Sequence, residues 1–270
     1  MSIQPSEAQT GGSTRLAIVG TDETAAIEAI LTASLSDQPG LELLDRANLG
    51  LLENERALGI IGAKAKAAGA NALAFLEFIP GPSQRLISLR IVETTHGQVL
   101  QHLFLPEGND LPGVAETLGA QIAEKSRDAA STALADKTPV ALLGLRFELS
   151  RPENPAREYA LNQLIASQLH QQSSLRVLER WQSEALLFER VAKAETGDLA
   201  GGALLIDGLI KEGAESWTVH LRLRAPGSET VRKLEISHPE GDLNGLATAV
   251  VAGFMKDAGK TPVAATDRRV

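Results

Sequence analysis

The chain contains an internal repeat, and this feature constrains its fold more than any other. The stretch LLDRANLGLLENER begins at Leu43, and VLERWQSEALLFER begins at Val177. Both place an aliphatic pair before an acid and an arginine, and both close on Glu-Arg. The offset between the first arginines, 180 − 46, and that between the last arginines, 190 − 56, are both 134. A constant offset of this kind is typical of a duplicated structural unit.

The segments that flank the motif repeat in the same order. In each copy an apolar series with the spacing i, i+3, i+4 and i+8 predicts an amphipathic helix: Ile27, Ile30, Leu31 and Leu35, then Leu161, Leu164, Ile165 and Leu169. The strand LAIVG matches VALLG at an offset of only 124, so 134 − 124 = 10 residues are inserted after it in the second copy. Pro152 and Pro155 predict that the insertion is a loop. Later strands and the closing helix match at offsets of 131 and 132.

These matches predict an α/β (α+β) protein made of two tandem repeats. Each repeat is expected to be a mixed β-sheet packed with helices, in the order β-α-β-α-β-β-β-α. The predicted organisation is a disordered lead-in at 1–14, a first domain at 15–130, a linker at 131–139, a second domain at 140–258 and a disordered tail at 259–270. The hydrophobic content of 43% in 270 residues is enough for two separate cores.

Composition argues against several classes of partner. A net charge of −8 repels polyanions, and an aromatic content of 3% leaves few rings for stacking on bases, so we expect no nucleic-acid partner. No apolar run approaches the ~18 residues of a membrane-spanning helix, so we expect no direct membrane span. The first fourteen residues do not resemble a secretory signal. We therefore expect the periplasm or cell envelope if a signal segment was removed, and otherwise the cytoplasm.

The sequence offers no convincing active site, and we expect a protein that is not an enzyme and needs no cofactor. It has no cysteine, which excludes thiolate ligands and a cysteine nucleophile. None of the five histidines has a partner at metal-ligand spacing, so no metal site is expected. Asp207 and Glu77 lie at nearly matched positions of equivalent strands, with 207 − 77 = 130, but nothing in the sequence makes them face each other.

The repeated acid-arginine and Glu-Arg pairs have two interpretations. They comprise Asp45, Arg46, Glu55 and Arg56 in the first copy, and Glu179, Arg180, Glu189 and Arg190 in the second. In the structural interpretation, which we prefer, the acid caps a helix N-terminus and the neighbouring arginine bridges to a carboxylate of its own domain. In the alternative, the two arginines of the acid-arginine pairs bind an acidic group.

The two tryptophans are candidates for partner binding because aromatic residues are so scarce. Trp181 corresponds to Ala47 of the first copy, so only the second copy carries a large apolar side chain there. It is expected either to cap the core or to lie in an interface. An exposed tryptophan at this position or at Trp217 is a candidate anchor for a partner protein.

The order of these segments resembles the soluble periplasmic domain of the curli-secretion CsgG family. The resemblance rests on LELLDRANLGLLENERAL, AKAAGANALAFLEF and LISLRIVETTHGQVLQ in the first copy. In the second copy it rests on LRVLERWQSEALLFER, GGALLIDGLI and WTVHLRLRAPGSETVRKL. It covers nearly all of 15–130 and 139–258 and extends to the related amino-terminal domain of TolB. What it implies is a noncatalytic assembly or accessory module of the bacterial envelope.

Two departures from the CsgG pattern narrow this expectation. The chain lacks the lipid-modified cysteine typical of that family, and neither copy carries the long alternating insertions of its membrane-embedded part. We therefore expect no secretion pore, but a duplicated domain that recognises other envelope proteins, with a homo-oligomer also compatible. A small-ligand receptor or enzyme with a cleft between the copies, and a cytosolic regulatory module, stay open as alternatives.

Overall fold

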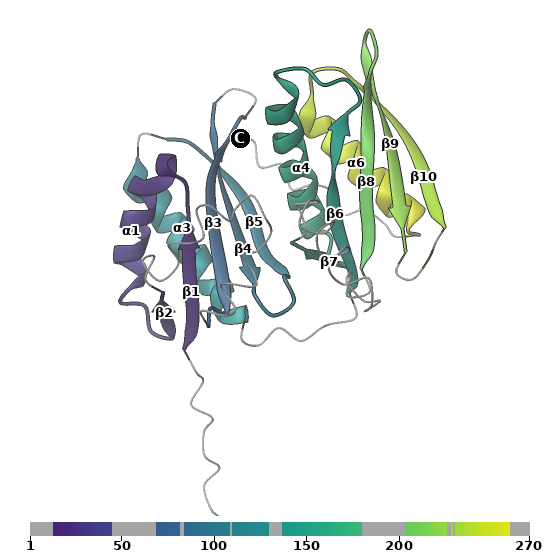
Figure 1. Ribbon diagram of the computed structural model, residues 1–270. Coiled ribbons are helices and arrows are strands. Elements are labelled where there is room, and N and C mark those ends of the chain that lie inside the picture. Colours follow the sequence, from purple (N-terminus) through teal and green to yellow (C-terminus); the bar gives the residue numbers. More distant parts are fainter. Residues whose placement is uncertain are drawn as a thin grey trace, which may run out of the picture.

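The computed structural model describes residues 13–44, 69–81, 84–108, 110–129, 137–179, 203–225, 228 and 230–259. Within them the chain forms two halves, each a five-stranded mixed sheet with helices packed on it (Figure 1). This confirms the predicted α/β fold with two tandem sheet-and-helix units. The second helix predicted for each repeat lies outside the described residues, as do residues 1–12 of the predicted lead-in and residues 260–270 of the predicted tail.

The first half is built around one mixed sheet. Its elements are β1 (Thr14–Val19), a short 3₁₀ turn (Asp22–Thr24), α1 (Ala25–Leu35), β2 (Leu41–Leu43), β3 (Ala72–Ile79), β4 (Leu86–Glu93), β5 (Val99–Pro106) and α3 (Leu111–Ala129). The strand order is β2-β1-β3-β4-β5. β1 is parallel to β2 and β3, whereas β3, β4 and β5 form an antiparallel meander.

The second half repeats this topology strand for strand. Its elements are β6 (Thr138–Phe147), α4 (Asn154–His170), β7 (Leu175–Leu178), β8 (Leu204–Glu212), β9 (Ser216–Arg224), β10 (Val231–Pro239) and α6 (Leu243–Asp257). Read from the opposite edge, the order β10-β9-β8-β6-β7 matches that of the first sheet. The parallel and antiparallel strand pairs also occur at the same places as in the first sheet. Two independent strand orders agree because both halves fold from the same pattern of apolar segments.

The insertion in the second copy divides between a longer strand and the predicted loop. β6 begins at Thr138, inside the predicted linker, ends at Phe147 and is 10 − 6 = 4 residues longer than β1. Residues 148–153, which include Pro152, then form a loop that leads to α4. The register shifts between Leu142 and Gly144, and Gly144 adopts a φ of 109°, which glycine accommodates without strain. Pro155 lies in the first turn of α4, where the missing N–H costs nothing.

The elements form four layers in the order helix, sheet, helix, sheet (Figure 1). α1 and α3 cover one face of the first sheet, where Leu31, Ile91 and Leu118 belong to one buried cluster. The other face of that sheet turns toward the second half, and Phe75 and Val92 belong to the same buried cluster as the second core. Every residue of β4 is therefore buried.

The second sheet differs, because among the described residues helices pack on only one of its faces. α4 and α6 pack on the inner face, and buried and more exposed residues alternate along β9. Alternation of this kind is expected for a sheet with one solvated face. The part of the chain that the structure describes contains no helix that is long and apolar enough to cross a membrane.

Two glycine substitutions are expected to change stability in opposite directions. A Cβ at Gly208 in β8 would lie 2.7 Å from the carbonyl oxygen of His220 and 3.2 Å from the Cα of Leu221 on the neighbouring strand. Gly208→Ala should therefore lower the free energy of unfolding by about 1–3 kcal/mol. A Cβ at Gly119 in α3 would meet only Leu31 and Ser34, at 3.5 and 3.6 Å.

Gly119→Ala should raise the free energy of unfolding by up to about 1 kcal/mol, because alanine is the better helix former. Thermal unfolding followed by circular dichroism measures both changes. A stabilising Gly208→Ala would show that the two strands are not held at this separation.

Candidate functional site

The two halves meet where the edge strands of their sheets approach each other. Gln98, just before β5, forms a bridge with Leu178 at the end of β7. The backbone N–H of Glu179 donates a hydrogen bond of 2.7 Å to the carbonyl oxygen of Gly97. This contact places Glu179, which belongs to a repeated acid-arginine pair, beside the first sheet. Buried polar side chains at this junction include Arg90, His102, Gln163 and Ser167.

Arg90 on β4 is the centre of this polar group. Its Nε lies 3.0 Å from Oε2 of Glu179, which comes from the second half, and its Nη2 lies 3.7 Å from Oε1 of Glu77 on β3. Its Nη1 donates a 3.3 Å hydrogen bond to Oε1 of Gln163 on α4. The guanidinium carbon also lies 4.9 Å from the ring centroid of Phe75, a cation–π geometry. A single buried arginine thus joins β3, α4 and the end of β7.

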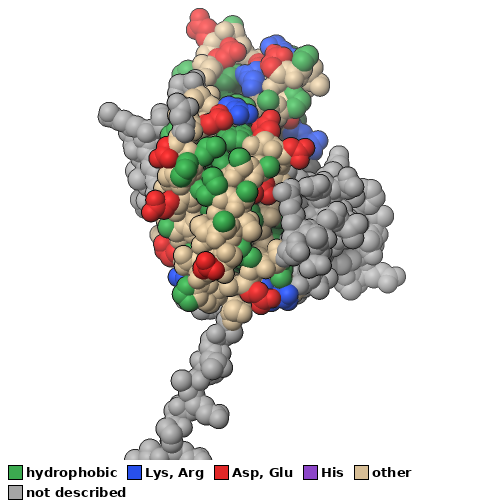
Figure 2. All heavy atoms as spheres, turned by 90° about the vertical axis from the view of Figure 1, so that its left-hand side faces the viewer, with side chains coloured by type: hydrophobic (Ala, Val, Ile, Leu, Met, Phe, Trp, Pro, Cys, Tyr) green, Lys and Arg blue, Asp and Glu red, His purple; other side chains and the backbone are tan. Residues whose placement is uncertain are grey.

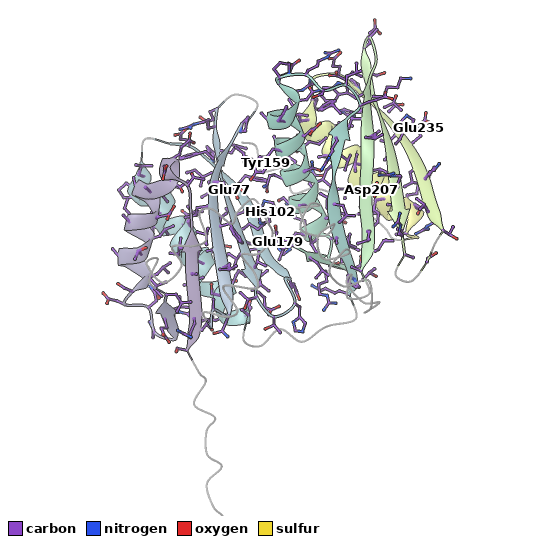
Figure 3. All side chains as sticks on the ribbon, viewed as in Figure 1. Glu77, His102, Tyr159, Glu179, Asp207 and Glu235 are labelled. Atoms are coloured by element: carbon purple, nitrogen blue, oxygen red, sulfur yellow. The ribbon has the colours of Figure 1, made fainter. Side chains whose placement is uncertain are left out.

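A second set of polar side chains extends from Arg90 along β5 and α4 (Figure 3). His102 Nε2 lies 3.4 Å from Ser88 Oγ, and the carbonyl oxygen of His102 accepts a 3.1 Å hydrogen bond from Ser167 on α4. Gln163 Nε2 donates a 2.7 Å hydrogen bond to the Tyr159 hydroxyl. We call the group formed by Arg90, Glu77, Glu179, Gln163 and His102 the junction cluster.

The electrostatics of the junction keep its histidines neutral. Burial lowers the pKa of His102 well below 6.5, and the positive charge of Arg90 and the proximity of His170 act in the same direction. Burial also lowers the pKa of His170 to about 4 from 6.5, with further lowering by Lys137 and Lys125. A histidine that stays neutral down to this pH cannot act as a general acid near neutrality.

This arrangement predicts that the protein loses stability in mild acid. An unfolded histidine binds a proton near pH 6.5, whereas folded His170 binds one only near pH 4. The unfolded state therefore holds more protons between these values, and the free energy of unfolding falls as the pH drops through this window. The slope is about 1.4 kcal/mol per pH unit for each such group.

Urea unfolding between pH 4.5 and 7.5 measures this slope. His170→Gln should give a flatter profile than the wild type, because glutamine does not titrate. Equal slopes in the two proteins would contradict the assignment.

The junction cluster holds the two halves together. Its one cation, Arg90, faces two carboxylates, and its contacts with Glu179 and Gln163 cross from the first half to the second. Among the described residues no group of three or more His, Asp or Glu side chains is arranged to hold a metal ion. Sequence analysis did not identify Arg90, although a charged residue within the otherwise apolar strand LISLRIV is a signal for a buried ion pair.

Of the eight residues in the repeated acid-arginine and Glu-Arg pairs, only Glu179 lies within the described residues. Its ionic partner Arg90 belongs to the first half, so this ion pair joins the two copies. The helix that the sequence predicts after Glu179 lies outside the described residues. The others lie outside the described residues, together with Trp181: Asp45, Arg46, Glu55, Arg56, Arg180, Glu189 and Arg190.

Trp217 is not an exposed anchor for a partner. Its side chain is 1% exposed and points into the second core from β9. Its ring meets that of Phe147 edge-on at a centroid distance of 6.0 Å, and the Arg157 guanidinium lies 5.0 Å from its centroid. The physical reason is the strand period, since Trp217 shares the inward face with Val219, Leu221 and Leu223.

The register of the sheets also corrects the comparison of Glu77 with Asp207. Across the first sheet Phe75 pairs with Arg90, and across the second Asp207 pairs with Arg222. Since 222 − 90 and 207 − 75 are both 132, Asp207 is the equivalent of Phe75, while Glu77 corresponds to Leu209. Asp207 forms an ion pair with Arg222 in its own sheet and has no counterpart carboxylate in the first half at that position.

Comparisons with known proteins add a weak likeness only. No protein family matches the sequence, and no curated protein matches it. Among solved structures, TolB from Acinetobacter baumannii is similar with a TM-score of 0.32 and 12% identity. The likeness covers 42% of this chain and 28% of the TolB chain, so it concerns part of each protein.

Proposed function

We propose that the protein is a noncatalytic accessory or assembly protein of the bacterial envelope that binds other proteins through its duplicated α/β units. The envelope assignment comes from the resemblance of both copies to the periplasmic domain of the CsgG family. The noncatalytic assignment is supported by the junction cluster, whose ionisable groups contact one another. The alternative of a receptor or enzyme acting between the halves would need those groups to face a ligand.

The observation that carries the proposal is the unequal covering of the two sheets. The face of the first sheet that holds Arg90 is buried by the second half, whereas the equivalent face of the second sheet is exposed around Leu209, His220 and Arg222. Leu209 lies on this exposed face and is 46% exposed. We call it the outer face of the second sheet. Because the junction cluster holds the two halves together, the outer face keeps one orientation. A preorganised surface of this kind loses less conformational entropy when it binds a partner.

Site-specific photo-crosslinking in cells tests the recognition role. A photoreactive residue at Leu209 should give a discrete adduct with an envelope protein. The matched control is Leu149, an equally apolar residue that is 57% exposed and lies beyond the end of β6. Adducts at Leu149 alone, or equal adducts at both positions, would contradict recognition through the outer face.

Fractionation of cells that express the protein from its natural gene tests the compartment. The envelope proposal expects the protein to fractionate with periplasmic or envelope markers. Recovery with cytosolic markers would support the regulatory-module alternative instead.

A further inference from the structure

The junction inside the chain joins a sheet face of the first half to a helix of the second half. Arg90 on this sheet face contacts Gln163 of α4, and the carbonyl oxygen of His102 accepts a hydrogen bond from Ser167 of α4. Because the fold is duplicated, the chain contains a second copy of this sheet face and a second copy of this helix. The second copies are the outer face of the second sheet and helix α1, which lie at opposite ends of the layered molecule (Figure 1). Neither is covered by another element among the described residues.

Positions on the two open surfaces match positions on the joined ones, although several of the side chains differ. On the sheet, Arg222 occupies the position of Arg90, as the shared register shows. On the helix, the offset of 134 relates Gln163 to Ala29 and Ser167 to Ala33, both of which are exposed. Short side chains at these positions present no steric barrier to a sheet that approaches α1 as the first sheet approaches α4.

The charges of the two open surfaces are opposite. The outer face of the second sheet, with His220 counted as neutral, carries 6 − 2 = 4 net positive charges: Arg146, Arg176, Lys211, Arg222, Arg224 and Lys233 against Asp207 and Glu235. This face is basic although the whole chain has a net charge of −8.

The layer formed by α1, α3 and the turns that flank α1 is acidic. With the buried Glu28 left out, it carries 2 − 6 = −4 net charges: Lys125 and Arg127 against Asp22, Glu23, Asp37, Glu116, Glu124 and Asp128. Figure 2 views the molecule from this side and shows Asp and Glu side chains placed around a mostly neutral and apolar centre.

We propose that copies of this chain associate head to tail, with the outer face of the second sheet of one copy placed on the α1 and α3 layer of the next. This deepens the proposed function by naming a second copy as the partner of that face. A second copy is favoured over another acidic partner because one chain carries both complementary surfaces and already joins their equivalents internally. The contact is heterologous, so it builds a ring if the rotation closes and a filament otherwise.

The chemistry of the outer face determines how strong this contact is. Phe75 and Val92, which are buried at the internal junction, correspond to Asp207 and Arg224 on the outer face, with 224 − 92 = 132. Contacts between charged groups guide the approach of the two copies and fix how they align, but they add little hydrophobic stabilisation. Association should therefore be weaker than the internal junction and sensitive to salt.

Sedimentation of the purified wild-type protein over a concentration series tests this directly. The Debye length is about 30 Å at 0.01 M salt and about 3 Å at 1 M. Mass should rise with concentration at the low salt, and the dissociation constant should increase at least tenfold at the high salt. A wild type that stays monomeric under both conditions overturns the proposal, and if it then binds anionic lipid vesicles the face belongs to a membrane surface.

A charge swap between two exposed sites identifies the surfaces. Lys211→Glu with Lys233→Glu lowers the net charge of the outer face by four, and Asp37→Lys with Glu116→Lys raises that of the helix layer by four, so each altered surface becomes neutral. Each doubly substituted protein alone should associate at least tenfold more weakly than the wild type. An equimolar mixture of the two should recover association as a one-to-one pair, because the unaltered outer face of one variant meets the unaltered helix layer of the other.

A mixture that stays monomeric, or substituted proteins that associate like the wild type, would overturn the head-to-tail contact. That failure leaves the recognition role intact if photo-crosslinking at Leu209 still yields an adduct with a different protein. Adducts that contain only this chain would support the self-association.

Discussion

Arg90→Ala is expected to lower the free energy of unfolding by about 3–5 kcal/mol, because it removes a buried cation that faces two mostly buried carboxylates. The Arg90 side chain is 9% exposed, and the side chains of Glu77 and Glu179 are 19% and 21% exposed. These acids gain little compensating hydration when the guanidinium is removed. The substitution also removes the hydrogen bond to Gln163 and the contact with Phe75. Urea unfolding monitored by circular dichroism measures the loss.

The duplication provides a matched control for this prediction. Arg222 occupies the equivalent position of the second sheet and pairs with Asp207, but its side chain is 56% exposed. Arg222→Ala should therefore change the free energy of unfolding by only about 0–1 kcal/mol. A double-mutant cycle of Arg90→Ala with Glu179→Gln should give a coupling energy of about 0.5–3 kcal/mol. Equal losses for the two arginine substitutions would contradict the role of burial.

Trp217→Ala should lower the free energy of unfolding by about 3–5 kcal/mol, since it removes a large buried side chain. The ring fills the second core between Phe147 and Arg157, and a cavity would remain because both neighbours are held by other contacts. Arg157, for example, also forms a 3.0 Å ion pair with Glu212. Trp217→Phe keeps part of the volume and should give an intermediate loss.

The control for the tryptophan substitution is Leu209 on the adjacent strand. Its side chain points away from the core, so Leu209→Ala should remain within about 0.5 kcal/mol of the wild type. Chemical denaturation of the three substituted proteins ranks them. A loss at Leu209 as large as that at Trp217 would mean that the outer face is covered and would argue against it as a docking surface.

Much of the fold is readable from the sequence because the relevant signals are local or repeated. The series of Ile27, Leu31 and Leu35 predicts a helix and its buried face, and all three side chains are buried in α1. The repeat then transfers this prediction to Leu161, Ile165 and Leu169 of α4. The inward orientation of Trp217 was also present in the alternation of SWTVHLRLR, which places it on the apolar face of the strand.

Alignment of the two copies by sequence failed in the third strand, where a shift of one residue changes which residues are equivalent. The sequence match of the third strands at an offset of 131 differs by one from the register offset of 132. A slip of one residue exchanges the two faces of a strand. Only the pairing of Arg222 with Asp207 across β8 and β9 established that Asp207 replaces Phe75, and therefore that a carboxylate replaces an aromatic ring on this face.

The sequence by itself determined that the chain has two units, that each holds a mixed sheet, and which helix faces turn inward, since periodicity and duplication are recorded along the chain. The tertiary structure alone decided that the second unit buries a face of the first, and that Arg90 and Glu179, 89 residues apart by 179 − 90, form an ion pair. Two sheets of the same topology can bury different faces, because burial depends on what packs against each sheet. The contact between the two halves joins residues that are distant in sequence, so no local sequence pattern predicts it.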